Sequence, residues 1–336
     1  MQRYTEVGTS MKRFLNAFGH ENGVEVLTLI DQKTSTAAKI VPEIGNNLVS
    51  WTIVKDGGTL ELMWIPSEIK DLHKEPRKFF GNPVLFPFPG RIPKGTFQFQ
   101  NQTFQMPVNF SDGTAIHGFV HDKKWEISEI SPPSDNEVSI TSTYDLNAEI
   151  QEYFPFPFHL EMTYTLREYE IETLFVAKNV GDKAFPFGYG LHPYFQLHGK
   201  REDWVLYCPG TEQFILDDLI PRGDRILVPE EYDFQEEKSL DDVYLDDLFG
   251  DLKKQNGKII SWIRNLKTNF KLIVSSDQNF DYYVLFAPDW GDFICIEPYT
   301  CIPNAYNLSN RRMVTGLRIL EPNETYKAKI LFKVEI

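Results

Sequence analysis

Short apolar runs, or a strict alternation of apolar and polar residues, recur along most of the chain and stop at Gly, Asn, Asp or Pro. A period of two with breaks at turn-forming residues is typical of β-strands joined by tight turns. No segment sustains a 3.6-residue apolar period, so helices are predicted only as short pieces at 10–18 and 241–249. The clearest predicted hairpins pair 48–55 with 59–65, 96–100 with 103–106, and 282–287 with 293–297.

Many antiparallel strands with short turns predict a β-sandwich or barrel. No Ser/Gly-rich linker or block of charge divides the chain, and the acidic stretch 217–247 is interpreted as a loop-rich insertion. We therefore expect an all-β fold, a single large antiparallel β-sandwich over 1–336, with 1–22 as an N-terminal extension or short helix. Two domains are the lesser alternative. Further strands are predicted at 125–130, 137–144, 161–168, 170–179, 314–319 and 327–334.

Composition narrows the class of protein. Of the 336 residues, 42% are hydrophobic and 14% aromatic, which suffices for a large core and excludes a disordered chain. The 48 acidic residues exceed the 34 basic ones, and a net charge of −14 opposes binding of nucleic acid. No apolar run reaches the roughly 18 to 20 residues of a membrane helix, and the first residues lack an apolar signal core. We expect a soluble, cytoplasmic protein with no nucleic-acid or membrane partner.

The cysteines and the common enzyme signatures exclude several further classes. Cys208, Cys295 and Cys301 are an odd number without CxxC spacing, which argues against a disulfide scaffold or a zinc ribbon. Cys295 lies in an apolar strand and is expected to be a small buried hydrophobic residue. The chain has no GxGxxG, P-loop, HExxH or GxSxG motif, so no nucleotide cofactor is expected.

The tripeptide Phe-Pro-Phe occurs three times, at 86–88, 154–156 and 185–187. Proline removes a donor from a strand ladder, so these pieces are expected at strand edges or in extended loops. Two interpretations remain open. The rings either pack together at sheet edges, or they form the rim of a cleft that stacks on a sugar.

Three kinds of residue could carry chemistry. Glu297 ends an apolar strand before a proline, on the same face as Cys295, and a carboxylate there is costly unless it has a partner or lies at a cleft. Partial burial would raise its pKa and make it a better base near neutral pH. His117 precedes a glycine and His192 precedes a proline. Each is either a structural histidine that is hydrogen-bonded at a turn or a functional residue at a cleft. Arg91 offers fixed donors for hydroxyls or carboxylates.

At these residues the sequence resembles the aldose 1-epimerase (galactose mutarotase-like) family. Each motif alone is weak, but five occur in family order over most of the chain. Two departures concern the sugar: Gly90 stands where galactose mutarotases usually have Asn, and Phe119 where a second Gly often follows the His-Gly pair. The matching stretches are NPVLFPFPGRIPKGTF (82–97), IHGFVHDKKWEI (116–127), GLHPYFQL (190–197), LDDVY (240–244) and IEPYTCIPNAYN (296–307).

The resemblance implies a large antiparallel β-sandwich with a cleft on one sheet, in which the α and β anomers of a free aldose interconvert. It implies Glu297 as the general base and His192 as the general acid. Arg91, His117 and Asp241 are the implied substrate-binding residues, although Asp242 adjoins Asp241. The implied partner is a monosaccharide, no metal or cofactor is required, and the protein is expected to be a monomer or homodimer.

The acid must be protonated at rest, and nearby carboxylates, including Glu297 and Asp241, are expected to hold His192 as an imidazolium. Other interpretations stay open. One is a hexose-6-phosphate 1-epimerase with a phosphate pocket from Lys94 and 123–124, ranked lower because of the net charge. Another is a non-catalytic carbohydrate-binding protein of the same fold.

Two further interpretations belong to other classes of enzyme. A cupin-like metal enzyme would use ligands such as His117, His121 and Glu126, but the His-x-His spacing expected of a cupin is absent. A glycosidase would need a second carboxylate opposite Glu297, where the resemblance places a histidine.

Overall fold

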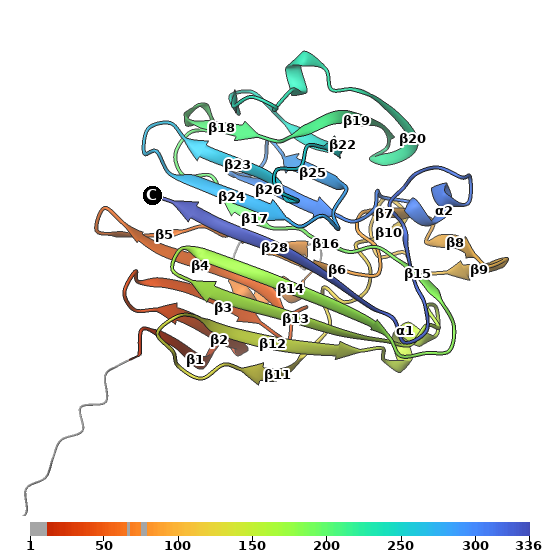
Figure 1. Ribbon diagram of the computed structural model, residues 1–336, viewed down its shortest axis with the longest axis horizontal. Helices are drawn as coiled ribbons and strands as arrows, with labels where there is room; N and C mark the ends of the chain where they lie inside the picture. Colours follow the sequence, from red (N-terminus) through yellow and green to blue (C-terminus); the bar gives the residue numbers. More distant parts are fainter. Residues whose placement is uncertain (1–11, 66–67, 75–78) are drawn as a thin grey trace, which may run out of the picture.

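The computed structural model describes residues 12–65, 68–74 and 79–336, and the described chain is built almost entirely of antiparallel strands (Figure 1). The predicted all-β class and the sandwich architecture are confirmed. A nine-stranded sheet forms one layer, and its strands alternate buried and less buried residues, as in the BiBiBiB pattern that begins both the second and third of them. In order across the sheet it consists of β11 (Glu126–Ile130), β12 (Val138–Asp145), β13 (Phe158–Arg167), β14 (Glu170–Asn179), β28 (Thr325–Glu335), β24 (Lys271–Ser276), β23 (Ile259–Asn265), β18 (Trp204–Tyr207) and β21 (Lys238–Ser239).

An eight-stranded sheet carries most of the candidate residues. Its central strand, β26, is buried along its whole length. Ile294 and Ile296 pack into the main core, whereas Phe293 and Cys295 belong to a smaller cluster on the opposite face. The strands, in order, are β20 (Ile220–Leu227), β19 (Gly210–Asp217), β22 (Leu245–Leu252), β25 (Tyr282–Ala287), β26 (Phe293–Tyr299), β16 (Gly190–Leu191) and β6 (Val84–Leu85), with β17 (Tyr194–Gln196) also paired to β26.

Successive hairpins make a third, five-stranded sheet whose strands β1 and β2 contact the nine-stranded sheet. Three two-stranded ladders and a few short helices complete the fold. The five strands are β1 (Phe14–Glu21), β2 (Val24–Asp31), β3 (Thr36–Val41), β4 (Asn47–Lys55) and β5 (Gly58–Glu61). The ladders pair β7 (Arg91–Pro93) with β10 (Thr114–Ile116), β8 (Thr96–Phe99) with β9 (Gln102–Gln105), and β15 (Phe185–Phe187) with β27 (Arg318–Leu320). The helices are α1 (Ala148–Gln151), α2 (Ala305–Ser309) and the 3₁₀ turns η1 (Ile69–His73), η3 (Arg201–Asp203) and η4 (Glu230–Tyr232).

All three predicted hairpins are present, as β4–β5, β8–β9 and β25–β26. Both predicted helices are wrong. Residues 14–18 lie in β1, and the remainder of that prediction includes 10–11, which are outside the described residues. The second segment is a turn followed by β22, which hydrogen-bonds to β19 and β25. The acidic stretch predicted as a loop-rich insertion also contributes β20 to the sheet.

The three Phe-Pro-Phe tripeptides lie in the core. Phe86, Phe154 and Phe185 are fully buried, and the last two meet edge to face at 5.9 Å between ring centroids. The interpretation as a cleft rim is therefore wrong, because these rings pack against one another between the layers. Among the described residues, no helix is long and apolar enough to cross a membrane.

Candidate active site

Strand β26 carries a row of side chains on one face, and two of them, Glu297 and Tyr299, line a cavity. Cys295, Glu297 and Tyr299 alternate with the core residues of the strand, as the period of two requires. Glu297 is 1% exposed, and the Tyr299 hydroxyl donates a hydrogen bond of 2.6 Å to its Oε2. Its Oε1 is left facing His192.

His192 comes from the short connection between β16 and β17, both of which pair with β26. Gly190 allows the close approach, because a Cβ at that position would lie 2.6 Å from the ring of Tyr299. The imidazole stacks on Tyr194 at 4.6 Å between centroids with 6° between the planes, which fixes its orientation. Its Nε2 lies 3.4 Å from Oε1 of Glu297.

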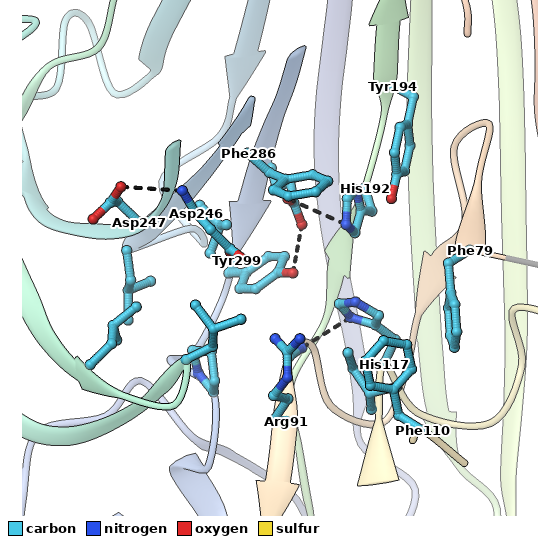
Figure 2. A pocket seen from close by; sticks show the side chains of 18 of the residues that line it. Phe79, Arg91, Phe110, His117, His192, Tyr194, Asp246, Asp247, Phe286 and Tyr299 are labelled. Carbon is cyan, nitrogen blue, oxygen red and sulfur yellow. Dashed lines mark hydrogen bonds and ion pairs between the residues drawn. The ribbon is translucent and has the colours of Figure 1, made fainter. Parts of the chain in front are cut away.

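Arg91 and His117 are positioned by the β7–β10 ladder, which pairs Arg91 with the residue before His117. The His117 backbone has φ 61°, and its Nδ1 accepts a hydrogen bond of 3.2 Å from the Gly90 amide, so the neutral ring carries its proton on Nε2. The Arg91 Nε donates to Asp112 at 2.9 Å. Figure 2 shows Arg91, His117 and His192 converging on one space.

That space is a cavity of about 340 Å³ with a polar floor and an apolar wall. β22 supplies two further polar residues to the lining, Asp246 and Asp247 (Figure 2). Gln213 holds Asp247 through a hydrogen bond of 2.7 Å from its Nε2. The wall is formed by aromatic and aliphatic side chains, namely Phe79, Phe80, Phe110, Ile116, Tyr194, Leu216, Leu219, Leu248, Val284, Phe286, Trp290 and Pro303.

A cavity of this shape, with a few convergent polar groups and a hydrophobic wall, suits a small polar ligand with apolar faces. The sequence model of the aldose 1-epimerase family matches residues 25–333. The chain belongs to the aldose 1-epimerase family. Curated relatives of this family member include the uncharacterized protein YihR of Escherichia coli, 27% identical over 230 residues that cover 67% of this chain and 71% of YihR. The plasmid-encoded protein LacX of Lactococcus lactis is 26% identical, covering 77% of this chain and 84% of LacX.

Solved structures share the fold of this aldose 1-epimerase family member. A galactose mutarotase-like protein from Clostridium acetobutylicum superposes with a TM-score of 0.85 at 23% identity, covering 96% of this chain and 99% of that one. The galactose 1-epimerase of Lactobacillus acidophilus superposes with a TM-score of 0.75 at 21% identity, with the same coverage of 96% and 99%.

Burial shifts the pKa values of the ionisable residues in the site of this family member. It raises the pKa of Glu297 well above its usual value, against the opposing hydrogen bond from Tyr299. It lowers the pKa of His192 to about 3, and that of His117 well below its usual value. The expectation of a resting imidazolium at His192 is wrong, because loss of water penalises the charged ring and the positive charge of Arg91 penalises it further.

Asp241, by contrast, does not line the cavity. It is exposed in the turn before β22, beside the equally exposed Asp242, and the carboxylates brought to the site are Asp246 and Asp247. Sequence reasoning missed them because it treated 241–249 as a helix. The segment 245–252 (LDDLFGDL) has no regular apolar alternation, so the sequence pattern carries little signal for this strand.

The lysines proposed for a phosphate pocket are also elsewhere. Lys123 pairs with Glu149, Lys124 pairs with Glu126, and Lys94 is exposed in the turn after β7. Nor do His117, His121 and Glu126 gather as cupin-type ligands. Within the described parts of the chain, the His, Cys, Asp and Glu side chains close enough to hold a metal ion are those of a different group, His192, Cys295 and Glu297.

Proposed function

We propose that this protein is an aldose 1-epimerase that interconverts the α and β anomers of a free aldose. The observation that carries the proposal is the buried pair of Glu297 and His192, with Oε1 and Nε2 3.4 Å apart on the floor of the cavity. A carboxyl and an imidazole so close together can act as base and acid on two oxygens of one carbon. Membership of the aldose 1-epimerase family supports the same reaction class.

Anomer exchange requires one base and one acid, the roles that we assign to Glu297 and His192. The O1 hydroxyl must lose a proton while the ring oxygen O5 gains one, which breaks the C1–O5 bond and releases the open-chain aldehyde. Rotation about C1–C2 and reclosure then give the other anomer. In this proposal Glu297 takes the O1 proton and His192 protonates O5, each within hydrogen-bond reach of about 2.6–3.2 Å.

The raised pKa of Glu297 fits this assignment, because it favours a carboxyl group that holds a proton before the sugar binds. One proton shared by the two groups leaves one acid and one base, whichever group holds it. Moving that proton from Oε1 of Glu297 to Nε2 of His192 creates the carboxylate and imidazolium that the reaction uses, and it changes no net charge in the cavity. The hydrogen bond from Tyr299 stabilises the carboxylate when it forms.

Arg91 and His117 would bind and polarise the sugar. The Nε2–H of a neutral His117 is a fixed donor, and the remaining guanidinium donors of Arg91 are available beyond its bond to Asp112. Donors already oriented toward the ring oxygen and hydroxyls stabilise negative charge that develops there. Asp246 and Asp247 would accept hydrogen bonds from sugar hydroxyls on the opposite side.

The charges of the cavity favour a neutral sugar over a hexose 6-phosphate. Of the described lining residues, Arg91 is the cationic side chain, and it is already paired with Asp112, whereas Asp246 and Asp247 add acidic groups. A phosphate dianion would meet more negative than positive charge. A purely sugar-binding protein would have no need for two adjacent buried proton-transfer groups, whose burial costs free energy.

The deciding experiment is an anomer-exchange assay, by polarimetry and by exchange NMR, on free aldoses and hexose 6-phosphates. We expect the protein to accelerate exchange of at least one free aldose, and Glu297→Gln to reduce that rate by about 10²–10⁴-fold while the fold is kept. The matched control is Glu126→Gln, which alters an exposed glutamate that pairs with Lys124. Near-wild-type exchange by Glu297→Gln would refute the assignment of the base.

The panel also separates the alternatives. Exchange restricted to hexose 6-phosphates would favour the phosphate-specific reaction. Saturable sugar binding by the wild-type protein without faster exchange would favour a non-catalytic carbohydrate-binding protein.

A further inference from the structure

Three buried side chains with metal-ligating atoms meet beside the cavity, and two of them, those of His192 and Glu297, line it. The ligand atoms of His192, Cys295 and Glu297 all lie within 4.8 Å of one another. Each side chain is almost fully removed from solvent, with 6%, 0% and 1% of the residue exposed, respectively. The mechanism above uses the imidazole and the carboxyl group but gives the thiol no role.

The spacing of this cluster suits a tetrahedral zinc ion. Bonds of about 2.0–2.2 Å to nitrogen and oxygen place two such ligands about 3.4 Å apart across a tetrahedral ion. The Nε2 of His192 and the Oε1 of Glu297 are 3.4 Å apart. A zinc–sulfur bond of about 2.3 Å requires the Sγ of Cys295 within roughly 3.6 Å of each, and the ligand atoms of the cluster already lie within 4.8 Å of one another.

The chemistry of the three donors selects the metal. Thiolate and imidazole are ligands of zinc and other thiophilic transition ions, whereas Mg²⁺ and Ca²⁺ require oxygen donors. Zinc sites with three protein ligands leave a fourth position for water. Here that position would open toward the cavity, because His192 and Glu297 both line it.

Neighbouring contacts already hold two of the ligands in place. Tyr299 binds the Oε2 of Glu297, so Oε1 remains for the ion, and Tyr194 stacks on the His192 ring. Such outer contacts orient ligands in known metal sites. A dication bound by one thiolate and one carboxylate is neutral overall, which offsets the cost of burying those two anions.

We propose that His192, Cys295 and Glu297 bind Zn²⁺, and that the bound ion stops anomer exchange. Binding forms one bond from zinc to each of Nε2, Sγ and Oε1, while the thiol proton and the carboxyl proton leave to water and no group is oxidised or reduced. Inhibition follows because the base and the acid both become ligands. The inhibition rests on the proposed function, whereas the binding site does not.

The binding test uses untagged protein freed of metal by a chelator and titrated with zinc chloride against a chromophoric competitor. We expect one zinc per wild-type chain, and a loss of affinity of about 100-fold or more in Cys295→Ser. Cys208→Ser is the matched control, since it removes an equally buried thiol outside the cluster and should bind like wild type. Cobalt(II) added instead of zinc should give thiolate-to-metal absorption in the wild type and not in Cys295→Ser.

Circular dichroism establishes that the variants are folded, and Cys295→Ala replaces Cys295→Ser if the serine protein is not. Equal zinc affinity in wild type and in the Cys295 variant would overturn the site, as would the absence of stoichiometric zinc binding below millimolar concentration.

The activity test compares the exchange rate of each variant with and without zinc. We expect zinc to abolish exchange in the wild type at one equivalent, and to require about 100-fold more in the Cys295 variant. Full activity with zinc bound through Cys295 would overturn the inhibition. Zinc binding through Cys295 in a protein that exchanges no sugar would support the metal site and refute the proposed function.

Discussion

Glu297 owes its properties to its burial and to one neighbour, Tyr299. Loss of water raises its pKa, and the hydroxyl of Tyr299 partly offsets this by donating to the carboxylate. The balance between the two sets how readily the proton moves to His192.

Removing the hydroxyl should shift that balance. In Tyr299→Phe, we expect the pKa of Glu297 to rise further and kcat to fall about tenfold or more, since a hydrogen bond to a charged group contributes about 1.5–3 kcal/mol. The alkaline limit of activity should move to higher pH, because the pair keeps its proton longer. A pH–rate profile measures both effects. Tyr144→Phe, which removes a buried hydroxyl away from the cavity lining, should leave the profile unchanged.

Asp246 should make sugar binding depend on pH. Burial raises its pKa to about 6, so the carboxylate that accepts hydrogen bonds is present above that pH and is lost as the pH falls through it. We expect KM to rise below about pH 6, by up to about tenfold for one charge-assisted bond. In Asp246→Asn the rise in this pH range should disappear. A wild-type KM that is constant from pH 5 to 8 would contradict this role.

The identities of several site residues could be predicted from sequence, but their protonation could not. Glu297, His192, Arg91 and His117 were named from local motifs, and the structure brings them around one cavity. The charge on His192 depends on how much water the surrounding sheets remove, which no motif encodes. Asp241 was expected to bind substrate at the start of a helix over 241–249, but the structure forms an exposed turn and β22 there, and Asp241 lies outside the cavity lining.

At the scale of single elements, short apolar runs predict strands correctly where turn-forming residues mark both of their ends. The hairpin β25–β26 was predicted almost to its ends because the turn PDWGD separates two apolar runs. The β1–β2 hairpin was missed although Asn22 and Gly23 form its turn, both with positive φ. An Asn-Gly pair is the strongest short signal for a hairpin, and it outweighs the weak helical preference of the preceding residues.

The short segment after β10 holds His117 by a contact that only glycine allows. Gly118 has φ 73°, and a Cβ there would lie 2.0 Å from the carbonyl oxygen of Phe86, which accepts a hydrogen bond from the Phe119 amide. The backbone must therefore keep its present path for the His117 ring to reach the cavity.

Gly118→Ala should strain this path severely. The backbone conformation alone costs about 1–3 kcal/mol, and the overlap with Phe86 adds to it. We expect a clear loss in the free energy of unfolding, measured with urea. The control is Gly113→Ala, which has φ 84° and nothing within 4 Å of the added carbon, so that only the conformational cost applies. Equal losses in the two variants would contradict the overlap argument.

For the whole molecule, the apolar pattern predicted the class of fold but not the partition into sheets. Each strand shows its period locally, whereas the choice of neighbour depends on which faces meet in the finished core. The pairing of β28 between β14 and β24 joins segments about 50 to 150 residues apart, and no local signal in any of them specifies it.

The packing of phenylalanine rings in the core can be tested by its contribution to the stability of the whole molecule. Phe154 is fully buried among Phe156, Phe158 and Phe185, so Phe154→Ala leaves a cavity that rigid neighbours cannot fill. We expect it to lower the free energy of unfolding by about 3–5 kcal/mol, measured by chemical denaturation. Phe18→Ala, at a side chain that is 52% exposed in β1, should cost far less.

The central place of β28 affects how the chain must be made. It is the last strand of the described chain, yet it lies in the middle of the nine-stranded sheet, with β14 on one side and β24 on the other (Figure 1). During synthesis, β14 and β24 each have an unpaired edge until β28 has left the ribosome. Edges of this kind invite pairing with other chains, so the nascent protein should depend on chaperones more than a protein of equal size whose central strands are translated first.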